Sequence, residues 1–196
     1  MILPIVAYGS RLLKVKASDV DTQDPNLKKL ISDMWETMYE ANGVGLAAPQ
    51  IGESLRLFVI DASPFAEDEE LSPREIIVLK DFKKVFINPI MTKERGKEWD
   101  YPEGCLSIPN IREDVCRKEE ITISFLDEKM EEQTLTLNGL AARVVQHEYD
   151  HIEGILFTDK LSPLKKRLLK GKLNSISKGN IKPNYKMRFS ANKKRK

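Results

Sequence analysis

The chain has 196 residues, the length of one domain with a sizeable core, and its 41% hydrophobic residues can fill such a core. No apolar run approaches the roughly 20 residues that a bilayer requires, which excludes a membrane-spanning protein. The opening MILPIVAYGS lacks the basic region and cleavage site of a signal peptide, so we expect a cytoplasmic protein. Two cysteines are too few for a disulfide scaffold.

The net charge of +2 hides an uneven distribution along the chain. Residues 160–196 contain 14 Lys and Arg and no Asp or Glu, which leaves residues 1–159 with 18 basic and 30 acidic residues, a net charge of −12. This pattern favours a polyanionic partner such as nucleic acid, although a solvated helix face would produce the same charges. We divide the chain into a main domain over residues 1–161 and a basic helix and tail over residues 162–196.

The first predicted helix follows Asp24-Pro25, because aspartate can cap a helix and proline suits its first position. Apolar residues then recur at helical spacing until Asn42-Gly43 ends the pattern. Residues 55–61 are predicted to form a buried strand. The next segment, residues 62–81, contains two prolines and a run of four acidic residues, which predicts an exposed loop or surface insertion.

Three further strands are predicted over residues 83–88, 120–126 and 133–137, the last two joined by a hairpin turn around residues 127–130. A second helix is predicted over residues 138–152, closed by the glycine at 154. Strands outnumber helices and are neighbours in sequence. We therefore predict a single α+β domain, with antiparallel sheets packed around the second helix.

The second predicted helix carries His147-Glu148-Tyr149-Asp150-His151, an H-E-x-x-H motif with the only two histidines of the chain. Histidines four positions apart lie on one helical face and can bind one metal ion, while the glutamate can reach a water on that metal. Chance produces this motif in roughly one of a thousand such sequences. Two ordinary surface histidines are the alternative.

A catalytic metal site usually has a third protein ligand. Cys105, in the sequence EGCLS of residues 103–107, is the best candidate, because a thiolate binds zinc or ferrous iron tightly. Acidic residues such as Glu153 stay open as alternatives. Cys116 has no acidic or imidazole cluster beside it in the sequence, so we interpret it as a small buried side chain.

The sequence GVGLAAPQ, residues 43–50, directly follows the first predicted helix. Two glycines in three residues let another backbone come close, as when a peptide pairs with the edge of a strand. Taken alone this signal is weak, because the end of a helix explains Gly43 equally well.

Together, GVGLAAPQ, EGCLS and QHEYDH closely resemble, in this order, the three motifs of peptide deformylases. The resemblance includes the opening MILPIVAYG and the segment LSPLKK after the H-E-x-x-H helix, so it spans most of residues 1 to about 170. All three motifs match without a departure at a functional position. Two regions differ from the shorter bacterial members: residues 62–81, and the longer, more basic tail beyond about residue 180.

The resemblance implies a metal-dependent hydrolase that removes the N-formyl group from the formylmethionine of newly synthesised polypeptides and releases formate. It implies Fe²⁺ as the metal, with Zn²⁺, Ni²⁺ or Co²⁺ as substitutes. Glu148 would be the base and acid, while the Gln50 amide and the Leu106 backbone N–H would stabilise the developing oxyanion. The implied metal ligands are Cys105, His147 and His151.

Substrate binding is expected to use the backbone of the formylated peptide, paired with residues 44–45 and 103–104. The methionine side chain needs an apolar pocket, for which Val44 and Val144 are the expected walls, although both could be ordinary core residues. The residues expected to contact the substrate are Val44, Gly45, Tyr101, Glu103, Gly104 and Val144.

Two other functions share parts of this pattern. The H-E-x-x-H motif alone favours a metallopeptidase, but the Cys105 ligand and GVGLAAPQ argue against one. A ribosome- or RNA-binding module with a structural metal would need four protein ligands, and the sequence offers no fourth candidate histidine or thiol.

The basic extension is the region where the resemblance is weakest. Residues 162–178 are predicted to form a third helix, and residues 192–196 to be mobile. A deformylase meets its substrate at the ribosome, so the positive charge predicts binding to ribosomal RNA near the exit tunnel. We expect deformylation of a short peptide to survive removal of residues 180–196. The apolar stripe expected to pack on the domain is Leu164, Leu168 and Leu169.

Overall fold

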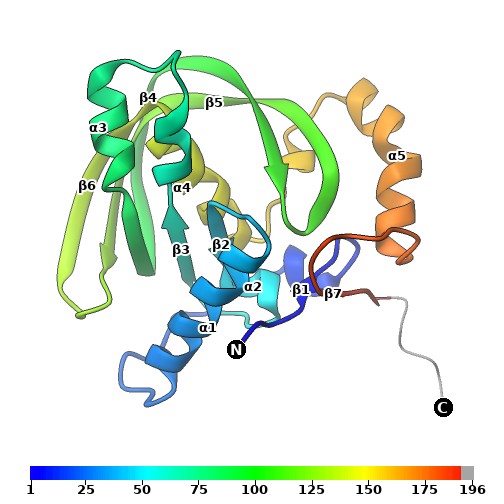
Figure 1. The fold of residues 1–196 in the computed structure, drawn as a ribbon, viewed down its shortest axis with the longest axis horizontal. Helices are drawn as coiled ribbons and strands as arrows, with labels where there is room; N and C mark the ends of the chain where they lie inside the picture. The colour runs from blue at the N-terminus through cyan, green and yellow to red at the C-terminus, as the bar shows by residue number, and fades with distance from the viewer. Residues whose placement is uncertain (191–196) are drawn as a thin grey trace.

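The structure is a computed structural model and describes residues 1–190. A five-stranded antiparallel sheet, in the order β2-β3-β4-β5-β6, packs against helix α4, and a small parallel sheet of β1 and β7 lies to one side (Figure 1). The predicted α+β class is confirmed. The strands are β1 (Ile5–Val6), β2 (Gly45–Ala47), β3 (Leu57–Asp61), β4 (Lys83–Cys105), β5 (Ile108–Leu126), β6 (Glu132–Asn138) and β7 (Met187–Arg188).

Five α-helices lie within residues 1–190, together with three short 3-10 helices. The first α-helix starts later than predicted: Asn26 is its N-cap, and the Asp24 carboxylate accepts from the Asn26 backbone N–H in the turn before it. The α-helices of the structure are α1 (Leu27–Glu40), α2 (Ala48–Ile51), α3 (Pro73–Lys80), α4 (Gly139–Ile152) and α5 (Pro163–Ser177). The 3-10 helices are η1 (Arg11–Lys14), η2 (Ser63–Glu67) and η3 (Phe157–Asp159).

Strands β4 and β5 form a hairpin much longer than the predicted segments 83–88 and 120–126. Residues 92–98 of β4 are exposed on both faces, so they show no apolar alternation from which a strand could be predicted. Several register shifts bend the pair, and the hairpin closes with a two-residue turn between Cys105 and Ile108. The hairpin therefore brings the predicted cysteine ligand to the end of a strand.

Residues 62–81, predicted as an exposed loop or insertion, contain η2 and α3. The side chain of Ser72 accepts from the Glu75 backbone N–H, and the Glu75 carboxylate accepts from the Ser72 N–H, which forms a capping box. Leu79 is buried, whereas the acidic run over residues 67–70 is exposed. The prediction of a loop was wrong because the short helix buries few apolar side chains, so its sequence shows little periodicity.

The core lies mainly between the sheet and helix α4. Phe58 on β3, Phe86 on β4 and Phe125 on β5 lie in a row, with ring centroids 4.7 and 4.2 Å apart. Helix α1 packs its buried apolar face, including Met34 and Met38, into a second cluster with β2 and β3. These contacts hold α4 rigidly against the sheet, which matters because α4 carries the H-E-x-x-H motif.

Helix α5 buries an apolar face different from the one predicted. Leu164 and Leu168 are 66% and 73% exposed, whereas Leu169 is buried as predicted. The buried face consists of residues spaced three and four apart towards the C-terminal half of the helix, whereas the N-terminal half contacts the domain through the ion pair of Lys165 with Glu113 at 3.1 Å. The members of the buried face are Leu169, Leu173 and Ile176.

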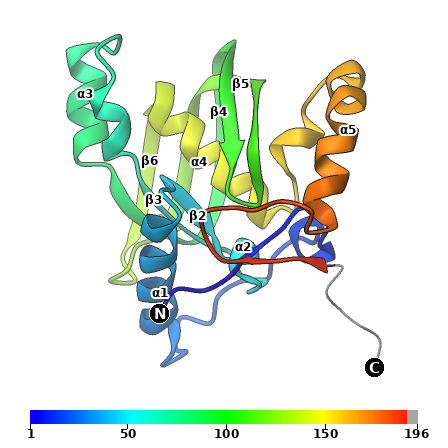
Figure 2. The ribbon, with the colours of Figure 1, turned by 45° about the vertical axis from the view of Figure 1, so that its right-hand side comes forward.

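After α5 the chain returns across the domain, and β7 pairs in parallel with β1 so that Met187 lies opposite Ile5 (Figure 2). The segment up to residue 190 is thus packed on the N-terminal strand. The expected mobility of residues 192–196 lies outside the described residues. Within residues 1–190, no helix is both long enough and apolar enough to cross a membrane.

The prediction that Cys116 is buried was wrong. It lies in the middle of β5 and is exposed, with its Sγ 3.9 Å from the Glu98 carboxylate on β4. The pairing of the two long strands places Asp100 directly opposite it. The acidic neighbours are therefore contacts across strands, which are not visible along the sequence.

Candidate active site

The predicted metal ligands converge where helix α4 faces the end of β4. The Sγ atom of Cys105 lies 3.3 Å from Nε2 of His151, and one ligand atom each from Cys105, His147 and His151 lie within 4.8 Å of one another. Glu153, the acidic alternative, instead pairs its carboxylate with Arg56 at 2.6 Å. A thiol and two imidazoles in this arrangement could bind one metal ion.

A buried ionic network supports the first histidine. The Nδ1 atom of His147 lies 2.9 Å from the Glu103 carboxylate, which also accepts two bonds from Arg117, at 2.6 and 2.9 Å, and one from Arg143 at 3.0 Å. Arg117 in turn donates to Asp150 at 2.6 Å. A carboxylate on Nδ1 leaves Nε2 of the histidine free for a metal, as is usual for metal-binding histidines.

The network sets the charges around the site. Burial alone would raise the pKa of Glu103, but the hydrogen bonds from Arg117 and His147 outweigh it and hold that pKa well below its usual range. Burial lowers the pKa of His147, yet contacts with Cys105 and Glu103 raise it overall. Burial lowers the pKa of His151, which favours the neutral imidazole that a metal requires.

Glu148 is the second buried carboxylate of the site, and it is 4% exposed. Burial raises its pKa to about 7, so the carboxyl group can both release and accept a proton near neutrality. Its Oε2 atom has no hydrogen-bond partner within residues 1–190. Gly45 makes room for it, because a Cβ atom at position 45 would overlap the Glu148 carboxylate.

Gln50 is positioned by the short helix α2. Its Oε1 accepts from the Ala47 backbone N–H at 2.8 Å, which turns the Nε2 end towards Cys105, 3.5 Å from Sγ, and Ser107, 3.3 Å from Oγ. The amide is almost completely buried. A donor held in this way points into the site with little freedom to rotate.

One cavity of about 410 Å³ connects these groups. Eleven of the twelve predicted site residues line it, and the exception is the buried ligand His151. Strand β2 lies at the edge of the sheet, so the backbone at Gly45 has one side open to this cavity. Nine further residues line the cavity that were not predicted as site residues, and no motif marks Phe65, Arg112 and Arg143 among them.

A buried carboxylate beside a Cys/His/His cluster, lining one cavity, is the arrangement of a metal-dependent hydrolase. Comparison with known proteins supports the same class of enzyme. The sequence profile of the family described as "Polypeptide deformylase" matches residues 2–167. A peptide deformylase of Christiangramia forsetii is 62% identical, and one of Flavobacterium johnsoniae is 54% identical, each over 99% of both chains.

The similarity extends to three dimensions. The crystal structure of a peptide deformylase from Legionella pneumophila superposes with a TM-score of 0.76 at 39% identity, covering 92% of this chain and 98% of that one. The chain therefore belongs to the peptide deformylase family, whose metal-dependent members remove the N-formyl group from nascent polypeptides.

Proposed function

We propose that one Fe²⁺ ion is held by the cluster at the end of β4 and that the surrounding side chains carry out deformylation. The observation that carries the proposal is the convergence of three ligand atoms within 4.8 Å beside a buried carboxylate. Two imidazoles and one thiolate suit Fe²⁺, and they also suit Zn²⁺, Ni²⁺ and Co²⁺ as substitutes. The proposed ligands are Cys105, His147 and His151.

Glu148 is the proposed proton carrier. When bound, the metal lowers the pKa of a water ligand and polarises the formyl carbonyl. The Glu148 carboxylate takes a proton from the attacking water and later delivers it to the departing amine nitrogen of methionine. Its pKa of about 7 supports both transfers at neutral pH.

Charge develops on the formyl oxygen during the reaction, and two donors of this chain are proposed to stabilise it. The Gln50 side-chain amide is already locked by its bond from the Ala47 N–H. The Leu106 backbone N–H lies in the turn after Cys105. Loss of one such donor typically lowers kcat by about 10²–10³-fold.

The substrate is proposed to lie along the open edge of β2. Its backbone pairs with residues 44–45 on one side and 103–104 on the other, which gives affinity that does not depend on later side chains. The methionine side chain occupies the cavity between Val44, Val144 and Tyr101, all three of which line it.

The assay compares formyl-Met-Ala-Ser with acetyl-Met-Ala-Ser and an internal peptide. We expect formate from the first and no cleavage of the other two. Cleavage of the internal peptide would identify a metallopeptidase instead.

The identity of the metal has a separate test. Enzyme loaded anaerobically with Fe²⁺ should lose activity in air, because a thiolate beside a redox-active metal is open to oxidation. Zinc-loaded enzyme should be more durable and slower. Equal decay of both forms under air and under nitrogen would contradict the assignment of iron.

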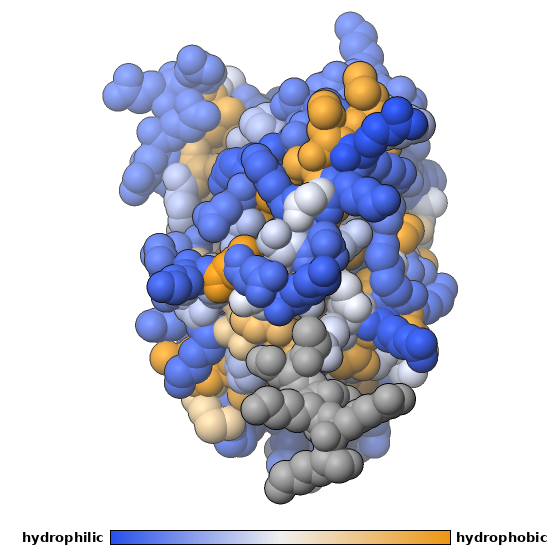
Figure 3. Space-filling model, turned by 90° about the vertical axis from the view of Figure 1, so that its right-hand side faces the viewer, coloured by the Kyte–Doolittle hydropathy of each residue, from blue (hydrophilic) through white to orange (hydrophobic). Residues whose placement is uncertain are grey.

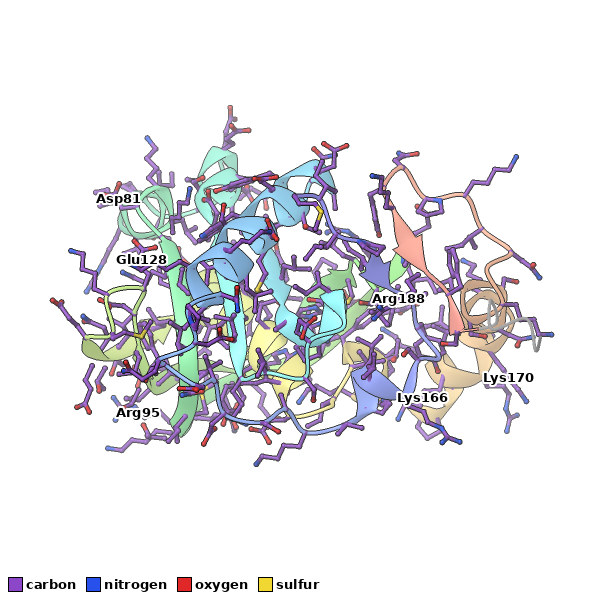
Figure 4. All side chains as sticks on the ribbon, turned by 90° about the horizontal axis from the view of Figure 1, so that it is seen from below. Asp81, Arg95, Glu128, Lys166, Lys170 and Arg188 are labelled. Carbon is purple, nitrogen blue, oxygen red and sulfur yellow. The ribbon has the colours of Figure 1, made fainter. Side chains whose placement is uncertain are left out.

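We further propose that the basic extension binds ribosomal RNA. Lys166, Lys170 and Arg188 lie at one end of the molecule, and Asp81, Arg95 and Glu128 lie at the other (Figure 4). The surface on the side of α5 is mostly hydrophilic, with a small apolar group towards its top (Figure 3). The 14 Lys and Arg of residues 160–196, with no Asp or Glu among them, form a cationic segment that attracts a polyanion.

A further inference from the structure

The turn between β4 and β5, residues 106 and 107, is tied to both ends of the chain. The carbonyl of Leu106 accepts a hydrogen bond from the Tyr185 hydroxyl at 2.7 Å. The carbonyl of Ser107 accepts from the Tyr8 backbone N–H at 2.9 Å. A two-residue turn at the mouth of a cavity would otherwise present these carbonyls to solvent, so the two bonds fix its peptide planes.

The C-terminal segment that carries Tyr185 is itself firmly docked. The Ile5 N–H donates to the Lys186 carbonyl and the Ala7 N–H donates to the Arg188 carbonyl, both at 2.9 Å. Met187 packs against two of the core clusters. Tyr185 therefore reaches the turn from a backbone that is held against the N-terminal strand, and not from a loose tail.

The Tyr185 hydroxyl is a dependable donor. The residue packs against the same apolar cluster as Leu106 and Met187. Burial raises the pKa of the phenol, so it keeps its proton throughout the range in which an enzyme works. Within residues 1–190, its hydroxyl forms one hydrogen bond, to the Leu106 carbonyl.

We propose that Tyr185 is a positioning residue for deformylation, which holds the turn so that the Leu106 N–H faces the formyl oxygen. The inference rests on the proposed role of the Leu106 N–H. The N–H and the carbonyl of Leu106 flank the same Cα atom, so a bond that fixes the carbonyl also limits how far the N–H can swing. Oxyanion donors act through preorganisation, and a displacement of about 1 Å lowers the rate.

The C-terminal extension thus contributes to the active site, which changes the expectation for a deletion of residues 180–196. That deletion would remove Tyr185 together with β7. We now expect it to slow the deformylation of short peptides, contrary to the expectation from the sequence.

The test is the full-length Tyr185→Phe variant, which removes only the hydroxyl. We expect kcat for formyl-Met-Ala-Ser to fall about 3–30-fold, a fraction of the loss caused by removing a donor outright. KM should stay within about twofold, because the interaction strengthens in the transition state. The metal content and the inhibition constant of the product Met-Ala-Ser, which has no formyl oxygen, should match the wild type.

The matched control is Tyr39→Phe. Its hydroxyl donates to the Asp61 carboxylate at 2.6 Å, so the variant loses a tyrosine hydroxyl and its hydrogen bond away from the turn, and its kinetics should equal those of the wild type. Wild-type kinetics in Tyr185→Phe would overturn the inference, as would an equal loss of kcat in both variants. A fall in metal content or in product affinity that matches the fall in kcat would also overturn it. A wild-type chain that releases no formate would instead refute the proposed function.

Discussion

Burial gives Glu148 properties that an exposed glutamate lacks. Because desolvation raises its pKa to about 7, the group exchanges a proton readily at neutral pH. Glu148→Ala should reduce formate release by at least about 10²-fold, the usual effect of losing a general base. Metal should remain bound, since the cysteine and both histidines are intact. Near-normal turnover in a variant with full metal content would remove Glu148 from the mechanism.

Glu103 illustrates how a residue one step away from the metal site can control it. Its carboxylate bonds to His147, and two buried arginines hold it in place. Glu103→Gln removes the negative charge that orients the imidazole and should weaken metal affinity about 10–100-fold. Competition with a chelator measures this affinity.

The control for that prediction is Glu98→Gln, the same change at an exposed position of the same strand, where metal affinity should be unchanged. Equal affinities for both variants would show that the Glu103 charge does not support the ligand.

The site shows which residues a sequence can reveal. The convergence of Cys105, His147 and His151 was predictable, because a metal needs particular residue types and the helix fixes the spacing of the two histidines. Arg117 and Arg143 were not, because they lie 14 and 40 positions from Glu103, and only strand pairing and the packing of α4 bring them together. Tyr185 was missed for the same reason, at 79 positions from Leu106.

At the scale of elements, a strand or helix is hard to predict from sequence when its side chains are exposed on every face. The segment 92–98 of β4 is polar on both faces, so its pairing with β5 leaves no hydrophobic pattern. Helix α4, by contrast, was predicted almost to the residue, because it is amphipathic and the glycine at 154 ends it with a positive φ of 73°.

The end of α4 is fastened to the sheet by an ion pair between Arg56, just before β3, and Glu153. The Nη1 atom of Arg56 lies 2.6 Å from Oε1 of Glu153, and the Nζ atom of Lys16 lies 3.0 Å from Oε2 of the same carboxylate. Burial would raise the pKa of Glu153, but these two cations lower it overall. A depressed pKa in the folded state means that the stabilisation exists above the unfolded pKa, near 4.3, and is lost as the pH falls through the folded pKa.

Glu153→Gln should therefore lower the free energy of unfolding by about 0.5–1.5 kcal/mol at pH 7, and the difference should shrink as the pH falls below about 4. Urea denaturation of the wild type and the variant, at pH 7 and again below about pH 4, measures this difference in the free energy of unfolding. The control is Glu53→Gln, an exposed position, which should have little effect at either pH. A deficit in Glu153→Gln that is independent of pH would point to poorer packing and not to the ion pair.

At the scale of the whole molecule, the C-terminal extension has two proposed roles, in ribosome binding and in support of the active site. The N-terminal strand β1 and β7 form one small sheet beside α2, while α5 extends to the outer side (Figure 2). Because β7 is the next element after α5, a deletion cannot separate the proposed ribosome binding from the proposed support of the active site. Substitutions on the exposed face of α5 can, since they leave Tyr185 and its hydrogen bond in place.

Reversal of three exposed charges of α5 to glutamate should weaken co-sedimentation with ribosomes, because these cations are proposed to meet phosphate groups. The deficit should be largest at low salt, and the dependence of log affinity on log salt should flatten by about 0.7–0.9 for each phosphate that the variant no longer neutralises. Formate release from a short peptide should be unchanged.

Three exposed lysines on α1, α3 and the β5–β6 hairpin form a control with the same change in net charge. If both triple variants bound ribosomes equally well at every salt concentration, the position of the charge would be irrelevant and α5 would not be the binding surface. The test set is Arg167→Glu, Lys170→Glu and Lys172→Glu, and the control set is Lys28→Glu, Lys80→Glu and Lys129→Glu.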